Sequence, residues 1–234
     1  MESVTTMIAN KKEFTKLVSS FVLGDGSLST TKSYYLVEQR TVERPQYNRK
    51  KNSAYRLKQL KVHQDYVEWQ VSILEELTSV HLVVVPHSVD SRGYNCNEKY
   101  QLSTKTHPFY TAMRERLYNS GVKQLDPHYL KLFDWQSAAI LYMDDGWIET
   151  QPRLTKETYV RANIASHSYT YAENLLLKQV LKEKLSIEFN VRRHKQRSGE
   201  YKWYLEAKKD HAKRFLSGIE RYVFPSFYYK LSYD

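Results

Sequence analysis

Two segments of the chain follow the same plan, and this repeat constrains the fold more than any other feature. Residues 77–123 and 184–230 each begin with an apolar strand pattern and pass through a polar turn into a strand of alternating residues. Each then continues as a helical pattern and ends near a lysine. The two turns hold Gly93 and Gly199, from a total of only seven glycines. The repeat indicates two copies of one structural plan.

Before each segment lies an apolar helical pattern that ends in an acid followed by glycine. These patterns are LVSSFVLGDG at residues 17–26 and AAILYMDDG at residues 138–146. Each copy therefore reads as helix, two strands, helix, two strands, helix. The sequence predicts an α+β fold of two pseudo-symmetric αββαββα halves, residues 1–122 and 123–234. We place the junction where Gly121 and Pro127 interrupt the helical pattern.

Two further helices have their own signals. Thr170 and Glu173 have the spacing of a capping box, and an apolar helical pattern follows them. Residues 65–77 carry apolar side chains along one face.

The letters YMDD at residues 142–145 also suggest the metal-binding turn of a reverse transcriptase. In a polymerase this turn joins two apolar strands, whereas Ala138, Ala139 and Leu141 favour a helix here. Asp134 is a suitable N-cap for such a helix, and Gly146 suits its end. The chain is also too short for the fingers, palm and thumb of a polymerase. The helical interpretation is the better one.

Two such helices packed side by side bring Asp25 and Asp145 to the same end of one interface. Ser20 and Gly24 are four positions apart on one face, and such small residues let a second helix approach closely. Like charges placed together repel each other, and divalent cations between them remove that cost. Hard oxygen ligands select Mg²⁺ or a similar ion.

The positive net charge of the chain indicates which class of molecule it binds. The formal charge of +10 and the pI of about 9.4 are typical of proteins that bind a polyanion such as nucleic acid. A lone cysteine, Cys96, excludes an internal disulfide, and no apolar run is long enough to span a membrane. The N-terminal residues lack a secretory or transit pattern, so we expect the protein to work in the compartment of its synthesis. The sequence leaves open whether this is an organelle matrix, a stroma or a bacterial cytoplasm.

Residues 18–26 and 138–146 resemble the two motifs of the single-chain, intron-encoded LAGLIDADG homing endonucleases, and the matched repeats extend the likeness over most of the chain. The chain departs from the family pattern at Leu23 and Met143, where an earlier motif acid would stand. The resemblance implies antiparallel sheets forming a DNA-binding saddle, with the motif helices at the interface. It further implies a monomeric, site-specific endonuclease that hydrolyses one phosphodiester per strand of double-stranded DNA at a long, non-palindromic target.

The resemblance also implies roles for individual residues. Asp25 and Asp145 correspond to the catalytic metal ligands, and the backbone carbonyls of Gly24 and Asp144 would help to hold two or three Mg²⁺ or other divalent ions. Lys123 and Lys230 correspond to the basic residues beside the metal centres. In the alternative interpretation, Asp25 and Asp145 are ordinary acids at the ends of exposed helices, and the two lysines are solvated surface residues. The interval from Asp25 to Lys123 is longer than that from Asp145 to Lys230, which an insertion in the first half would explain.

Alternation along the strands suggests a surface that reads DNA. In residues 99–105 polar side chains occupy one face and apolar ones the other, and residues 200–207 alternate similarly. Basic and amide side chains on such a face can pair with base edges in the major groove; an ordinary solvated sheet face is the alternative. The candidate DNA-binding residues are Arg56, Lys58, Lys99, Gln101, Ser103, Lys105, Arg161, Asn163, Arg192, His194, Lys202 and Tyr204.

The sequence also allows a second function. The same fold without the chemistry would serve as a group I intron RNA maturase or as a catalytically silent nucleic-acid-binding protein. Intron RNA is then the partner in place of, or besides, double-stranded DNA. The presence of both motif acids argues against a silent site.

Overall fold

A computed structural model describes residues 10–231 apart from 31–33, 38–39, 44–51, 90–94, 152–158 and 197–198. The predicted turn at Gly93 lies outside the described residues. The matching turn at Gly199 is present, with φ of 87°, a left-handed conformation that favours glycine.

The first half has the predicted order of elements around one antiparallel sheet. Its elements are α1 (Lys11–Leu23), β1 (Ser27–Thr30), β4 (Ser53–Leu60), the short helix η1 (Lys61–His63), α2 (Gln64–Glu75), β5 (Val80–Val85), β8 (Lys99–Thr104) and α3 (Pro108–Leu117). The strand order in the sheet is β1-β4-β8-β5.

The second half repeats this arrangement. Its elements are α5 (Trp135–Asp145), β11 (Gly146–Gln151), β12 (Tyr159–Ile164), α6 (Tyr171–Leu185), β13 (Asn190–Lys195), β14 (Tyr201–Lys208) and α7 (Lys209–Glu220). Its strand order, β11-β12-β14-β13, is the same as in the first half. The α+β fold with two αββαββα halves is therefore confirmed.

Two short hairpins are inserted in the first half only, as far as the described residues show. They are β2 (Tyr34–Val37) with β3 (Arg40–Glu43), and β6 (Ser88–Val89) with β7 (Asn95–Cys96). They account for the longer first interval between acid and lysine. The halves are connected through β9 (Tyr118–Asn119), β10 (Val122–Lys123) and α4 (Pro127–Leu130), and η2 (Pro225–Lys230) ends the second half. The domain boundary after residue 122 falls inside β10 and stays a prediction.

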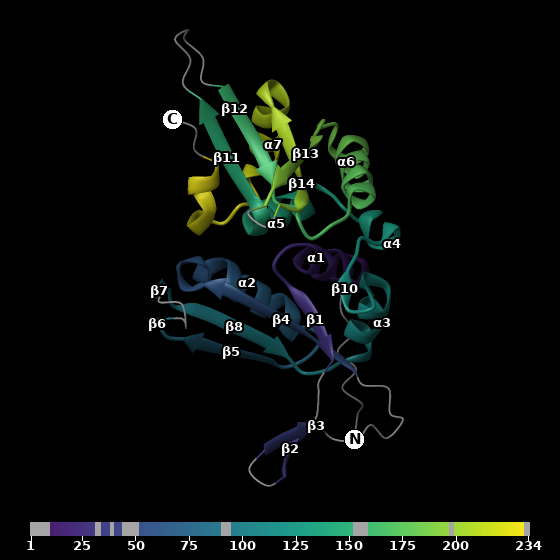
Figure 1. The fold of residues 1–234 in the computed structure, drawn as a ribbon, viewed down its shortest axis with the longest axis vertical. Helices are drawn as coiled ribbons and strands as arrows, with labels where there is room; N and C mark the ends of the chain where they lie inside the picture. The colour runs from purple at the N-terminus through teal and green to yellow at the C-terminus, as the bar shows by residue number, and fades with distance from the viewer. Residues whose placement is uncertain are drawn as a thin grey trace.

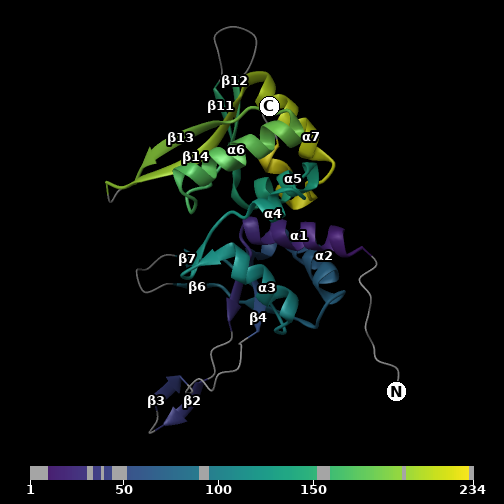
Figure 2. The ribbon, with the colours of Figure 1, turned by 90° about the vertical axis from the view of Figure 1, so that its right-hand side faces the viewer.

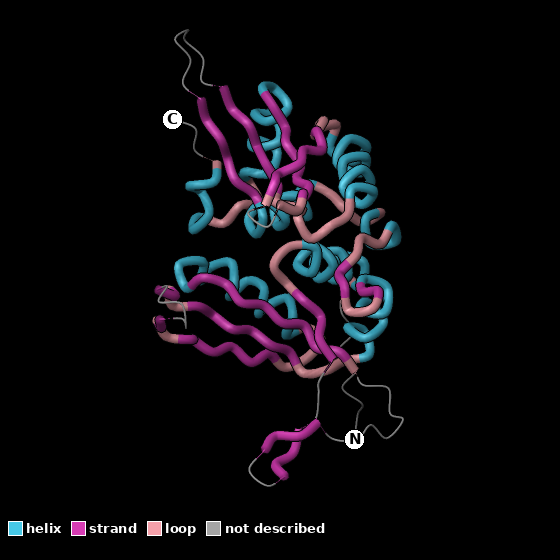
Figure 3. Tube along the Cα trace, viewed as in Figure 1, coloured by secondary structure: helices cyan, strands magenta, loops and turns pink. Residues whose placement is uncertain are grey.

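The two motif helices lie side by side between the sheets (Figures 1 and 3). Side-chain oxygens cap both helices, since Asn10 accepts from the backbone N–H of Glu13 and Asp134 accepts from that of Ser137. Residues 137–143 of α5 are buried without a break. A helix that is apolar all round belongs in a core, so the helix pair forms the centre of the molecule.

Both sheets face the same side of the molecule, and helices cover their other side (Figure 2). Alternation along β8 shows how: Tyr100, Leu102 and Thr104 are buried against the helices, whereas Gln101 is exposed. The predicted division of residues 99–105 into two faces is therefore confirmed.

The two other helical predictions hold with small changes. Thr170 and Glu173 form a complete capping box at the start of α6. The helix predicted for residues 65–77 begins one residue earlier and ends at Glu75, followed by a turn. No helix in the described parts of the chain is long and apolar enough to cross a membrane.

Candidate active site at the paired helix ends

The C-terminal ends of α1 and α5 meet closely, and acidic residues of both helices come together there. Asp144 places its carboxylate against Gly24, so closely that a Cβ atom at residue 24 would overlap it. The same carboxylate accepts a hydrogen bond from the backbone N–H of Asp25, with an N–Oδ2 distance of 3.1 Å. Gly24, which the sequence predicts to permit close approach of a second helix, thus packs against the Asp144 side chain of α5.

The environment of the three acids raises their pKa values. Burial raises the pKa of Asp145 to about 7, and the charge of Asp25 acts in the same direction. Burial also raises the pKa of Asp25, although a hydrogen bond from the Gln59 amide at 3.1 Å opposes this. The pKa of Asp144 is raised well above its ordinary value, first by burial and then by Asp25. The site therefore concentrates negative charge, with Asp144 and Asp145 half-buried and Asp25 more exposed.

A lysine lies beside each helix end and contacts its terminal carbonyl groups. The ammonium group of Lys123 donates to the carbonyls of Val22 and Gly24, both at 2.8 Å, and to that of Gly26 at 3.1 Å. Lys230 donates to the carbonyl of Met143 at 2.6 Å and lies 3.5 Å from that of Asp144. Each helix end therefore has one motif acid and one lysine, as pseudo-two-fold symmetry requires.

Burial lowers the pKa of both lysines, and the three acids oppose that effect. Both ammonium groups point at carbonyl oxygens of helix C-termini, where partial negative charge accumulates. This favours the protonated form of each lysine and fixes its position relative to the acids.

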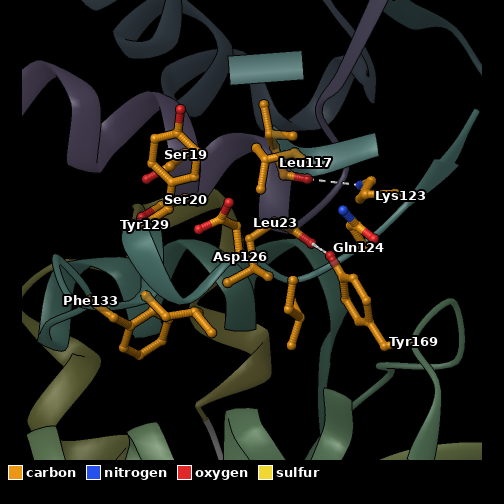
Figure 4. A pocket seen from close by; sticks show the side chains of 13 residues that line it. Ser19, Ser20, Leu23, Leu117, Lys123, Gln124, Asp126, Tyr129, Phe133 and Tyr169 are labelled. Atoms are coloured by element: carbon orange, nitrogen blue, oxygen red, sulfur yellow. Dashed lines mark hydrogen bonds between the residues drawn. The ribbon is translucent and has the colours of Figure 1, made fainter. Parts of the chain in front are cut away.

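Lys123 borders a small cavity at the junction of the two halves. Figure 4 shows it beside a small cavity lined mainly by apolar side chains of α1, α4 and the connecting segment. At the edge of this cavity the Tyr169 hydroxyl donates to the carbonyl of Leu23 at 2.9 Å, and the backbone N–H of Gln124 donates to the carbonyl of Leu117 at 2.8 Å.

Contacts between η2 and the first half position Lys230. Ser226 donates its hydroxyl to Asp65 at 2.6 Å, and its backbone N–H donates to the same carboxylate at 3.2 Å. The rings of His63 and Phe227 stack at a centroid distance of 3.7 Å. The C-terminal segment thus crosses to α2 and orients Lys230 toward the acids.

The donor set fits Mg²⁺ bound with the help of a substrate. Within the described residues, no group of three or more His, Cys, Asp or Glu side chains is arranged to hold a metal ion. Mg²⁺ commonly uses one or two protein carboxylates, with water and phosphate oxygens filling its other positions. Asp25 and Asp145 supply such carboxylates, and a cation would offset the cost of burial that raises the pKa values of both.

Sequence reasoning missed Gln59, whose amide orients Asp25. Gln59 lies on β4 in alternation with Tyr55 and Leu57, on the face that packs against the helices, and it is only 8% exposed. A polar residue at a core position of an alternating strand was the available signal. The contact of Asp144 with the Asp25 backbone had no such signal, because it depends on how the two helices pack.

The first sheet gathers its predicted DNA-binding residues on one face. In the register of β4 and β8, Arg56 lies opposite Ser103, and Lys58 lies opposite Gln101. Lys99 continues the same row on β8, and Lys105 follows just after the strand. The residues within the strands share the face that points away from the helices, and Lys105 is exposed just beyond it.

The second sheet holds its charged residues in an ion network. Glu206, 3% exposed, accepts from Arg192 at 2.8 Å and pairs with Lys208 at 3.0 Å and Arg161 at 3.5 Å. Asn163, predicted at the surface, is only 1% exposed.

The remaining predicted residues of this sheet share one face. In the register of β13 and β14, Arg192 lies opposite Tyr204 and His194 lies opposite Lys202. Sequence reasoning did not single out Glu206 as the residue that organises the cations here.

Comparison with known proteins places this arrangement in a family. The chain is 26% identical over 152 residues to the intron-encoded endonuclease ai4 of Dictyostelium discoideum, covering 64% of this chain and 86% of that protein. It is 31% identical over 129 residues to an uncharacterized protein of Methanocaldococcus jannaschii, covering 55% of this chain and 46% of that longer protein.

Solved structures share the fold. The homing endonuclease I-WcaI bound to its DNA recognition sequence superposes with a TM-score of 0.73 at 15% identity, covering 96% of this chain and 88% of that one. The meganuclease I-SmaMI bound to uncleaveable DNA gives a TM-score of 0.51 at 11% identity, covering 92% and 85%. A sequence model of the LAGLIDADG DNA endonuclease family matches residues 21–215, most of the chain, and the chain therefore belongs to that family.

Proposed function

We propose that the protein is a site-specific endonuclease that cuts both strands of double-stranded DNA with the help of divalent metal ions. The observation that carries this proposal is the meeting of Asp25 and Asp145 at the paired helix ends, each with a half-buried lysine beside it. Two pseudo-symmetric sites within one chain match the two strands of a duplex, so a monomer contains everything that the reaction needs.

Each residue has a part in the proposed reaction. Asp25 and Asp145 would hold the metal ions. The carbonyls of Gly24 and Asp144, which Lys123 and Lys230 contact in this structure, would add oxygen donors. Bound divalent ions supply Lewis acidity and activate water for in-line hydrolysis of a phosphodiester. Lys123 and Lys230 offset the negative charge of the phosphate in the transition state. Gln59 keeps the Asp25 carboxylate oriented through its amide hydrogen bond.

The sheet faces supply affinity and specificity in this proposal. The net charge of +10 favours contact with the phosphate backbone. The two reading faces carry different side chains at corresponding positions, so they recognise unequal half-sites. The target is therefore long and not palindromic. The proposal includes a role in the homing of a mobile intron.

A plasmid-library cleavage assay with Mg²⁺ tests this function. The native protein is compared with Asp25→Asn and Asp145→Asn, which keep side-chain size and remove charge. Double-strand cuts at one long site, reduced to nicking or to nothing by either substitution, support the proposal. Tight binding of intron RNA without any cutting of DNA would instead assign the chain to the maturase alternative.

A further inference from the structure

The edge strands β5 and β13 occupy equivalent positions in the two sheets, but β5 carries mainly apolar side chains and β13 mainly basic ones. Each is the last strand, paired with β8 or β14. In the first sheet Val83 lies opposite Gln101, and Val85 lies opposite Lys99. The corresponding positions of β13 carry Arg192 and His194. Two valines in the first half thus replace two cationic or titratable side chains in the second.

Val83 and Val85 are exposed on the face that carries the polar residues. Directly opposed residues in a sheet point to the same side, so these valines share the face of Gln101 and Lys99. Val83 is 42% exposed and Val85 is 38% exposed. Apolar side chains gathered on an otherwise polar surface commonly mark a binding site.

The charge around these valines indicates what covers them. Lys99 adjoins Val85, and Arg56 and Lys58 follow on the next strand but one. A second copy of this positive face would be repelled, whereas a polyanion would be attracted. In the major groove of DNA the thymine C5 methyl group is the apolar feature, and apolar side chains recognise it by contact.

We propose that Val83 and Val85 read thymine methyl groups in the half-site that faces the first sheet. The inference rests on the proposed function and names a specificity element within it. Gln101 beside Val83 strengthens the preference, because its amide can pair with the adenine of an A·T pair. Arg192 at the place of Val83 suits guanine instead. One half-site is then rich in A·T pairs at positions where the other half-site carries G·C.

The test begins with a randomised duplex library from which the wild-type protein enriches its target. The same selection is made with Val83→Ser and with Val84→Ser. Val84 is a matched control, since it is also 42% exposed on the same edge strand but lies on the opposite face. Val83→Ser relaxes a thymine preference in one half-site only, whereas Val84→Ser leaves the selected sequence unchanged.

A second measurement uses the wild-type protein and altered DNA. Replacing the selected thymine with uracil removes only the methyl group. The dissociation constant for the wild-type protein then rises about fourfold, the value of one buried methyl. The same replacement has no effect on Val83→Ser.

Each outcome is decisive. A library that yields no enriched site overturns the proposed function and this inference with it. An enriched site without thymine in either half, or one insensitive to uracil, overturns the inference while the endonuclease stands. A concentration-dependent dimer that both Val83→Ser and Val84→Ser dissociate would assign the edge strand to a second copy, and would likewise overturn it.

Discussion

Replacing Asp145 with Asn should stabilise the metal-free protein at alkaline pH while it removes activity. Asp145 is poorly solvated and lies beside Asp25, so its ionised form is unfavourable in the folded state. Asn has nearly the same shape and no charge. An acid kept for its chemistry at a cost in stability is expected at a catalytic site.

The size of the effect follows from the pKa. In the unfolded chain an aspartate titrates near pH 4, whereas burial and Asp25 raise the pKa of Asp145 to about 7 in the folded state. Between these two pKa values the folded state binds the proton of Asp145 more tightly than the unfolded chain does. The free energy of unfolding therefore falls as the pH rises, and the full loss is reached above the folded pKa. From pH 5 to pH 8 the penalty grows by about 2–3 kcal/mol. This corresponds to a shift in Tm of about 5–10 °C for a chain of this length.

The assay is thermal unfolding of the wild-type protein and Asp145→Asn in EDTA at pH 5 and pH 8. The Tm advantage of the variant should widen toward pH 8, and added Mg²⁺ should raise the Tm of the wild-type protein alone. Glu115→Gln, at an exposed position on α3, serves as the control and should show no widening. A Tm difference that stays the same at both pH values, or a variant less stable at pH 8, would refute the reasoning.

Three further predictions follow from the site and the second sheet. Gly24→Ala should lower the free energy of unfolding by about 1–3 kcal/mol, because its methyl group overlaps the Asp144 carboxylate. The double variant with Asp144→Ala should recover most of the loss in a urea titration. Lys123→Met should cost about 1–3 kcal/mol by leaving three carbonyls without their donor; an equal loss in Lys131→Met, an exposed control, would contradict this. Glu206→Gln should strengthen binding of duplex DNA at low salt and steepen the salt dependence, because its cationic partners are released toward phosphates. Fluorescence anisotropy at low and high salt measures this effect, and unchanged affinity at low salt would count against it.

Much of the fold could be predicted from the sequence because each local signal agreed with the repeat. The acid–glycine endings of residues 17–26 and 138–146 defined the two motif helices, and alternation in residues 99–105 defined the faces of β8. The capping box at Thr170 was readable for the same reason. Local signals of this kind depend only on residues close together in the sequence, so a single sequence is enough to recognise them.

The missing details depend on contacts between distant segments. The fit of Asp144 against Gly24 requires knowledge of how α1 and α5 pack. The ion network around Glu206 joins three strands, and burial of Asn163 depends on those same neighbours. Alternation predicts which face a strand residue occupies, but not which partner covers it there.

The central claim is that each helix end forms one site that cuts one strand, and a strand-resolved cleavage assay tests it most directly. The enriched duplex is labelled differently on its two strands and incubated with Mg²⁺ and the wild-type protein, Asp25→Asn or Asp145→Asn. The account predicts cuts in both strands by the wild-type protein, and in each variant either loss of all cutting or nicking, with the two variants sparing opposite strands. A variant of either acid that still cuts both strands at the wild-type rate would contradict it.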